Sequence, residues 1–176
     1  ILNQVNILKT LASHFFTFAS MPSPKIELTD LNKVIEETIK LYELSYTDFT
    51  FVYKTQECEL MIKTDKKKIK QVITNLLDNS VRALIQSDVS LGGTKYVAIK
   101  TSVVRDSEEV EILVTDNGPG IKESIKDKLF FPYVSSEKKN MGLGLAIVHD
   151  TISQLGGKIR LLPSGKGATF QILLPM

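Results

Sequence analysis

The sequence predicts an α+β protein, a two-layer sandwich in which helices cover one face of a mixed, mainly antiparallel sheet. Helix-like and strand-like stretches do not alternate strictly along the chain, as they would in a parallel α/β fold. Successive strand-like stretches are joined by short turns, which favours antiparallel pairing. The chain has 176 residues, which is enough for one sizeable core with a small extra element.

The first twenty residues are predicted to form a separate helix. The prolines at positions 22 and 24 cannot continue a helix, so we expect domains over residues 1–22 and 25–176. Its apolar residues form a stripe along one side of the helix. A stripe of this breadth is typical of a bundle helix and needs a partner, either a second copy of the chain or a neighbouring helix. The stripe consists of Ile1, Val5, Leu8, Leu11, Ala12, Phe15, Phe18 and Ala19.

The second domain is predicted to begin with a strand at KIEL and a helix capped by Asp30 that runs to about Tyr46. FTFVYKT and ELMIK alternate as strands do. Asp65 caps a helix over residues 66–86, and YVAIKTSVV and EVEILVTD form a hairpin across RDSE. A helix from Gly142 to about Leu155 ends at two glycines, and GKIRLLPS and ATFQILLP form the last strand pair.

Composition excludes several classes of protein. A net charge of +2 does not indicate a nucleic-acid partner, and the apolar runs are too short to span a membrane. The single cysteine, Cys58, excludes a disulfide framework and is expected to be a half-buried strand residue.

Two asparagines follow one stripe of the helix over residues 66–86. Asn75, Asn79 and Arg82 recur at spacings of four and three, beside the apolar face. Asparagine is a poor residue for a helix interior, because its side chain competes for backbone hydrogen bonds. The stripe therefore indicates either amides that ligate Mg²⁺ or amides that are simply solvated.

An acidic strand end and a long loop form the second candidate site. Asp116 precedes Asn117-Gly118-Pro119-Gly120, a turn that is either ordinary or built for the close approach of a ligand. The following loop has no strand of its own, and loops of that length are usually functional. Its aromatic residues suit a small core, and Lys138 and Lys139 suit either a solvated surface or an anion site at a helix N-terminus.

Taken together, these segments resemble the ATP-binding domain of sensor histidine kinases, in the superfamily that includes DNA gyrase, Hsp90 and MutL. The matching motifs are NLLDNS, DNGPGI, LFFPYVSS, GLGLAIV and GKGATFQILLP, which lie within residues 65–176. The details look closest to the nitrogen-regulation type of sensor kinase. Residues 1–20 resemble the second helix of the dimerisation and phosphotransfer hairpin of that family.

The resemblance implies that Asn79 holds Mg²⁺ on the ATP phosphates, with Asn75 beside it and Arg82 near the phosphates. Asp116 would bind the adenine amino group with help from Thr169 through water, and residues 132–141 would form a lid. Asn140 and Met141 replace the glycine and the threonine or serine usual in the family, so nucleotide affinity should reflect them. The full set of expected ATP-binding residues is Asn75, Asn79, Arg82, Ala83, Asp116, Gly118, Gly120, Ile121, Phe131, Tyr133, Ser135, Ser136, Lys138, Lys139, Met141, Gly142, Leu143, Gly144, Leu145 and Thr169.

One position bears on the reaction. ATP-hydrolysing relatives carry a glutamate four residues before the metal-binding asparagine, whereas this chain has Asn75, which cannot accept a proton at neutral pH. The resemblance therefore implies transfer of the γ-phosphoryl group to a histidine, and then to an aspartate of a response regulator receiver domain. Neither His14 nor His149 has the acceptor pattern, so the acceptor helix is expected to lie outside this chain and no catalytic residue within it.

The implied setting is the cytoplasmic portion of a membrane-bound bacterial sensor, with the membrane segments upstream, which forms a homodimer through residues 1–20. Two alternatives to the kinase stay open. One is a non-catalytic dimerisation and signalling module with a decayed nucleotide site, and the other is a related ATPase or serine kinase.

Overall fold

The computed structural model describes residues 23–87, 93–134 and 142–176. The predicted helix over residues 1–20 lies outside these residues, and the domain boundary near Pro22 stays a prediction. A search of the described helices finds none that is both long and apolar enough to cross a bilayer.

Five strands form the main sheet, and their order shows that it is mixed. Four neighbouring strands pair antiparallel, while the edge strand β2 pairs parallel with β4. The predicted mixed, mainly antiparallel sheet is therefore confirmed. In spatial order the strands are β2 (Phe49–Thr55), β4 (Lys95–Val104), β5 (Glu109–Asp116), β7 (Thr169–Pro175) and β6 (Lys158–Leu162).

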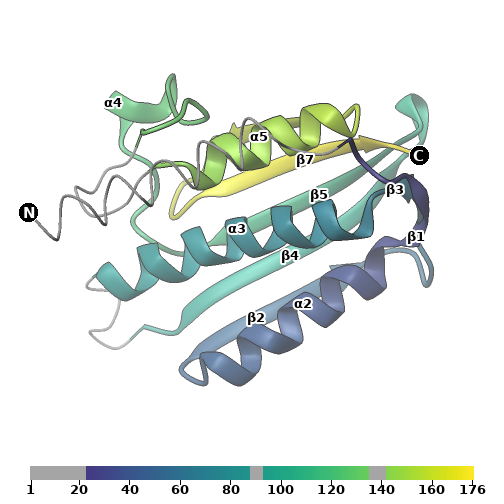
Figure 1. Cartoon of the computed structure of the whole chain (residues 1–176). Helices are drawn as coiled ribbons and strands as arrows, with labels where there is room; N and C mark the ends of the chain where they lie inside the picture. Colours follow the sequence, from purple (N-terminus) through teal and green to yellow (C-terminus); the bar gives the residue numbers. More distant parts are fainter. Residues whose placement is uncertain (1–22, 88–92, 135–141) are drawn as a thin grey trace, which may run out of the picture.

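Three helices lie side by side on one face of this sheet (Figure 1). They are α2 (Leu31–Ser45), α3 (Lys66–Gln86) and α5 (Gly144–Gln154). Asp30 caps α2 and Asp65 caps α3, as predicted, because the Asp30 carboxylate accepts one hydrogen bond from a backbone N–H group of the first turn and the Asp65 carboxylate accepts two. The other elements of the described residues are a small sheet of β1 (Glu27–Asp30) with β3 (Met61–Thr64), a 3₁₀ turn η2 (Arg105–Ser107) and the short helix α4 (Glu123–Lys126).

The core lies between the three helices and the sheet. Alternate residues of β5 point toward the helices, so Val110, Ile112, Val114 and Asp116 are buried while their neighbours are half-exposed. The apolar stripe predicted for α3 is also buried, and it meets this face of the sheet. The last inward position of β5 is a carboxylate, which places Asp116 at the border between core and surface.

Several local predictions differ from the structure. The strands β1 and β3 begin two residues later than KIEL and ELMIK indicate. Helix α5 begins at Gly144, because Gly142 has a φ of 61°, which no residue within a right-handed helix adopts. Cys58 is exposed and lies in a bend after β2 rather than in a strand.

Candidate functional site

A cavity of about 620 Å³ opens between α3, the start of α5 and the loop that follows β5. Most residues predicted to bind a ligand and present among the described residues line this cavity. They are Asn75, Asn79, Arg82 and Ala83 of α3, Asp116 of β5, Gly120 and Ile121 of the following turn, and Gly142, Leu143, Gly144 and Leu145 at the start of α5.

Asp116 is fixed in the cavity wall by three hydrogen bonds. Its Oδ1 accepts from the backbone N–H groups of Gly118, at 2.9 Å, and Ala168, at 3.2 Å. Its Oδ2 accepts from the Ser80 hydroxyl of α3, at 3.1 Å. Burial raises the pKa of the carboxyl above its ordinary value, although the three hydrogen bonds act in the opposite direction. The site therefore holds a rigid acceptor whose second oxygen has capacity for one further donor.

The turn after Asp116 needs its glycines for two different reasons. Gly120 has a φ of 76°, in the left-handed region that favours glycine. Gly118 is needed for space instead, because a Cβ there would lie 2.9 Å from Asp116 Oδ1. Gly118 thus supports the carboxylate through its N–H group and is not among the residues that line the cavity.

The two amides of α3 face the beginning of α5. Asn75 Nδ2 donates to the Gln71 carbonyl, at 3.0 Å, which leaves Asn75 Oδ1 toward the cavity, where a Cβ on Gly144 would lie 3.5 Å from it. Asn79 Nδ2 is buried and has no hydrogen-bond partner among the described residues. A buried amide without a partner costs free energy unless a ligand completes it. The Nδ2–H groups of Asn79 suit an acceptor such as a phosphate oxygen. Amide oxygens are ligands that Mg²⁺ accepts, so both amides fit a role in holding a hydrated Mg²⁺ and phosphate.

Helix α5 presents its N-terminus to the same cavity. Among the described residues, no side chain caps this helix, in contrast to α2 and α3. Leu143, Gly144 and Leu145 line the cavity, so the free N–H groups of the first turn lie at its wall, where they and the helix dipole favour an anion.

The aromatic residues of the loop divide between core and surface. Phe130 packs against Phe170 of the main core and against His149, with ring centroids 6.5 and 5.5 Å away, so it extends the main core and does not form a separate small one. Phe131 and Tyr133, which were predicted to bind ATP, are exposed and do not line the cavity. The predicted site residues Ser135, Ser136, Lys138, Lys139 and Met141 lie outside the described residues, as does Asn140.

The expectation for Thr169 is contradicted by the register of β7. Thr169 pairs with Thr115 on the face of the sheet away from the helices, where the two hydroxyls lie 3.2 Å apart. Ala168 lines the cavity instead, and it has no hydroxyl to offer a water molecule. The alternation of β7 could have shown this, because the apolar positions 170, 172 and 174 place even-numbered residues inward.

Ser80 of α3 is a site residue that was not among the predicted ones. A hydroxyl in an otherwise apolar stripe was the available signal, and the structure shows its use in the bond to Asp116. Pro119, Leu129, Val134 and Phe170 also line the cavity without having been predicted.

Comparison with known proteins identifies the class. Residues 64–176, which are more than half of the chain, match the family described as histidine kinase-, DNA gyrase B-, and HSP90-like ATPase. The chain therefore belongs to this family of ATPases, and the cavity lies among the residues that carry the match.

Individual proteins are similar to this chain over most of its length. The nitrogen regulation protein NtrY of Azorhizobium caulinodans is 30% identical over 178 residues, which cover 99% of this chain and 22% of NtrY. The catalytic domain of histidine kinase ThkA matches with a TM-score of 0.74 and 28% identity, over 86% of this chain and 95% of that one. The structure of ThkA in complex with response regulator protein TrrA shares the fold, with a TM-score of 0.76 and 24% identity over 99% of this chain and 48% of that chain. This chain thus spans less than a quarter of NtrY.

Proposed function

We propose that this chain is the ATP-binding catalytic part of a two-component sensor histidine kinase. The observation that carries the proposal is the convergence on one cavity of a fixed carboxylate, two helix amides and an uncapped helix N-terminus. These groups match the parts of an adenine nucleotide, because a carboxylate accepts from an amine, and amides and N–H groups suit a metal-bound phosphate.

Each group has a separate task in this proposal. Asp116 accepts a hydrogen bond from the exocyclic amine of adenine. Asn79, with Asn75 beside it, holds Mg²⁺, which when bound neutralises phosphate charge and orients the γ-phosphoryl group. The N–H groups at Gly144 and Leu145 bind phosphate oxygens directly. Phosphoryl transfer depends mainly on such positioning and charge neutralisation, so the domain needs no covalent intermediate of its own.

Asn75 favours transfer of the phosphoryl group to a protein over hydrolysis. It lines the cavity at the position where hydrolysing members of the superfamily carry a glutamate, and an amide cannot deprotonate water. His149 does not serve as acceptor in this proposal, because it lies outside the cavity lining, against Phe130. The acceptor is a histidine on a helix of the longer protein.

The partners follow from the same proposal. The relative ThkA has been seen with a response regulator, and we propose a receiver domain of that class as the recipient of the phosphoryl group. We also propose a homodimer through residues 1–20, because the broad apolar stripe of that segment needs a partner. We further propose that this chain is the cytoplasmic part of a longer, membrane-bound sensor; NtrY is more than four times as long as the stretch it shares with this chain.

Nucleotide binding is the first test. Calorimetric titration with ATP or ADP and Mg²⁺ should give a dissociation constant in the micromolar to millimolar range, and Asn79→Ala should weaken it. Thr169→Val is the matched control, because Thr169 faces the opposite side of the sheet and the change keeps a β-branched side chain. Wild-type protein that binds no nucleotide at millimolar concentration supports the alternative, a signalling module with a decayed site.

The kinase itself needs a second test. The chain is extended upstream to include a helix with a histidine, and it is incubated with ATP and Mg²⁺. Acid-labile phosphate on that histidine is the expected product. Nucleotide binding with acid-stable phosphate instead would indicate a serine kinase, and release of free phosphate would indicate an ATPase.

A further inference from the structure

Asp78 of α3 lies outside the cavity but is connected to it through Arg82. Its Oδ2 lies 4.0 Å from Arg82 Nη2, one turn further along the helix, and Arg82 lines the cavity. Its Oδ1 accepts a hydrogen bond of 2.6 Å from the hydroxyl of Tyr42, which belongs to the neighbouring helix α2. The two carboxylate oxygens thus face a phenol on one side and a guanidinium on the other.

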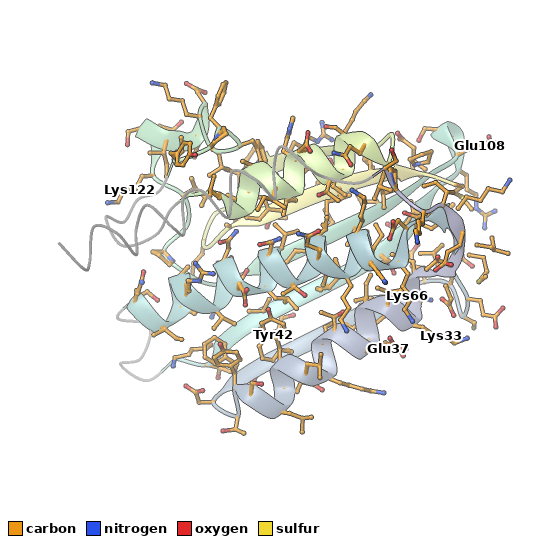
Figure 2. The ribbon with its side chains drawn as sticks, viewed as in Figure 1. Lys33, Glu37, Tyr42, Lys66, Glu108 and Lys122 are labelled. Atoms are coloured by element: carbon orange, nitrogen blue, oxygen red, sulfur yellow. The ribbon has the colours of Figure 1, made fainter. Side chains whose placement is uncertain are left out.

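Tyr42 is itself held by the core. Only 9% of it is exposed, and its ring packs against Tyr46 and Phe51, at centroid distances of 6.0 and 5.9 Å. Figure 2 shows Tyr42 between α2 and α3. Burial, and then the hydrogen bond to Asp78, raise the pKa of the phenol, so the hydroxyl keeps its proton and acts as a donor at neutral pH.

The phenol has two acceptors within reach but one proton. The Thr74 carbonyl lies 3.1 Å from it, whereas Asp78 Oδ1 is closer and carries charge, so the proton goes to the carboxylate. The rotamer of Asp78 is therefore set by a ring that cannot move without disturbing the contact between α2 and α3.

An arginine in this position benefits from such an anchor. The Arg82 side chain is 52% exposed, and a flexible side chain loses conformational entropy when it binds a ligand. An exposed pair at this spacing contributes little to stability. Its effect is expected instead on where the guanidinium lies before a ligand arrives.

We propose that Tyr42 and Asp78 are positioning residues that hold the Arg82 guanidinium at the cavity wall, ready for a phosphate group of the nucleotide. This inference rests on the proposed nucleotide function and deepens it, because it extends the binding machinery to α2. Asp78 also has an opposing effect, because its negative charge lowers the attraction of Arg82 for an anion. If positioning dominates, removing the Asp78 charge weakens ATP binding, and if charge dominates, removing it tightens ATP binding.

A double-mutant cycle tests the positioning role. Tyr42→Phe removes the hydroxyl and keeps the ring, and it should weaken ATP binding by roughly three- to tenfold. The same change in an Arg82→Ala background should have no effect, because no guanidinium is left to position. Loss of stability is common to both backgrounds and cancels in the comparison.

Two further measurements separate positioning from a general disturbance of the fold. Adenosine has no phosphate, so its binding should be the same in wild type and Tyr42→Phe. Tyr46→Phe is the matched control, because it removes a hydroxyl from the same end of α2 but not the one bonded to Asp78, and it should leave ATP binding unchanged. Asp78→Asn should weaken ATP binding, as Tyr42→Phe does.

The contrary outcomes are distinct. Equal effects of Tyr42→Phe in both backgrounds, or no loss of ATP affinity on Arg82→Ala, overturn the positioning role but leave nucleotide binding intact. Tighter ATP binding by Asp78→Asn shows that Asp78 only dampens the cationic charge, and it also overturns the positioning role. Wild-type protein that binds no nucleotide overturns the proposed function and this inference with it.

Discussion

Asp116→Asn is expected to change which base the cavity accepts rather than simply to remove binding. In the wild type, Oδ1 accepts from the N–H groups of Gly118 and Ala168, while Oδ2 accepts from Ser80 and faces the cavity. An asparagine must keep its oxygen toward the two N–H groups, because an NH₂ group there would meet two donors. Its NH₂ group then faces Ser80, whose hydroxyl can accept, and the cavity.

The orientation of this amide determines how much nucleotide affinity is lost. The cavity would present a donor to the amine of adenine, which is itself a donor, and a hydrogen bond to a charged group is lost. Such a bond contributes about 1.5–3 kcal/mol, so ADP affinity should fall by about tenfold to a hundredfold. Inosine diphosphate has a carbonyl at the same position of the base, and the amide can donate to it. The ratio of the two affinities should therefore shift by at least about tenfold toward inosine diphosphate.

Calorimetric titration of both proteins with both nucleotides, in the presence of Mg²⁺, measures this ratio. Thermal unfolding provides the control for folding. Because burial raises the pKa of Asp116, its charged form is disfavoured in the fold, and wild-type stability declines as pH rises through that pKa. The asparagine variant lacks this decline, so its stability relative to wild type should improve with rising pH. Unchanged ADP affinity, or an equal loss for both nucleotides in a folded variant, would refute the reasoning.

Three further predictions follow. Gly144→Ala should leave stability unchanged or raise it by up to about 1 kcal/mol, because alanine is the better helix former, yet it should weaken nucleotide binding by covering the start of α5. Denaturant unfolding measures the stability and calorimetry the affinity, and an unchanged affinity would contradict the role of this helix end. Asp65→Ala should cost about 1–2 kcal/mol at pH 7, because Asp65 accepts hydrogen bonds from the N–H groups of Lys25, Lys67 and Lys68. Burial alone would raise the pKa of Asp65, but these hydrogen bonds lower it below 3.8, so the difference from wild type should persist above pH 3.8 and shrink below it; a difference independent of pH would argue against the charged cap. Asn75→Glu should raise ATP hydrolysis at least about tenfold, since a positioned general base contributes about 10²–10⁴, and release of phosphate measures it; an unchanged rate would show that residue 75 does not decide between hydrolysis and transfer.

Local signals predicted much of the fold correctly. The starts of α3 and α2 followed from Asp65 and Asp30, because an N-cap acts within one helical turn. The hairpin of β4 and β5 followed from alternation, which needs no knowledge of the rest of the chain. The start of α5 did not, because a glycine with positive φ and a glycine inside a helix look alike in a sequence.

The candidate site could also be predicted only in part from the sequence. Asn75, Asn79 and Arg82 could be grouped from helical spacing, which places them on one stripe. The bond between Ser80 and Asp116 joins residues 36 positions apart, and the bond between Tyr42 and Asp78 crosses from one helix to another, so neither has a local signature. The residue that lines the cavity is Ala168, one position before the predicted Thr169. In a strand, a shift of one residue moves a side chain to the opposite face.

Amide chemical shifts during titration with ADP and Mg²⁺ test the central claim most directly, since they report where the nucleotide binds. The proposed site predicts the largest changes at Gly118 and Ala168, beside Asp116, and at Gly144 and Leu145, at the start of α5. Residues on the outer face of the sheet, such as Lys158 of β6, should change little. Saturable changes confined to another surface, or none at millimolar ADP, would contradict the account.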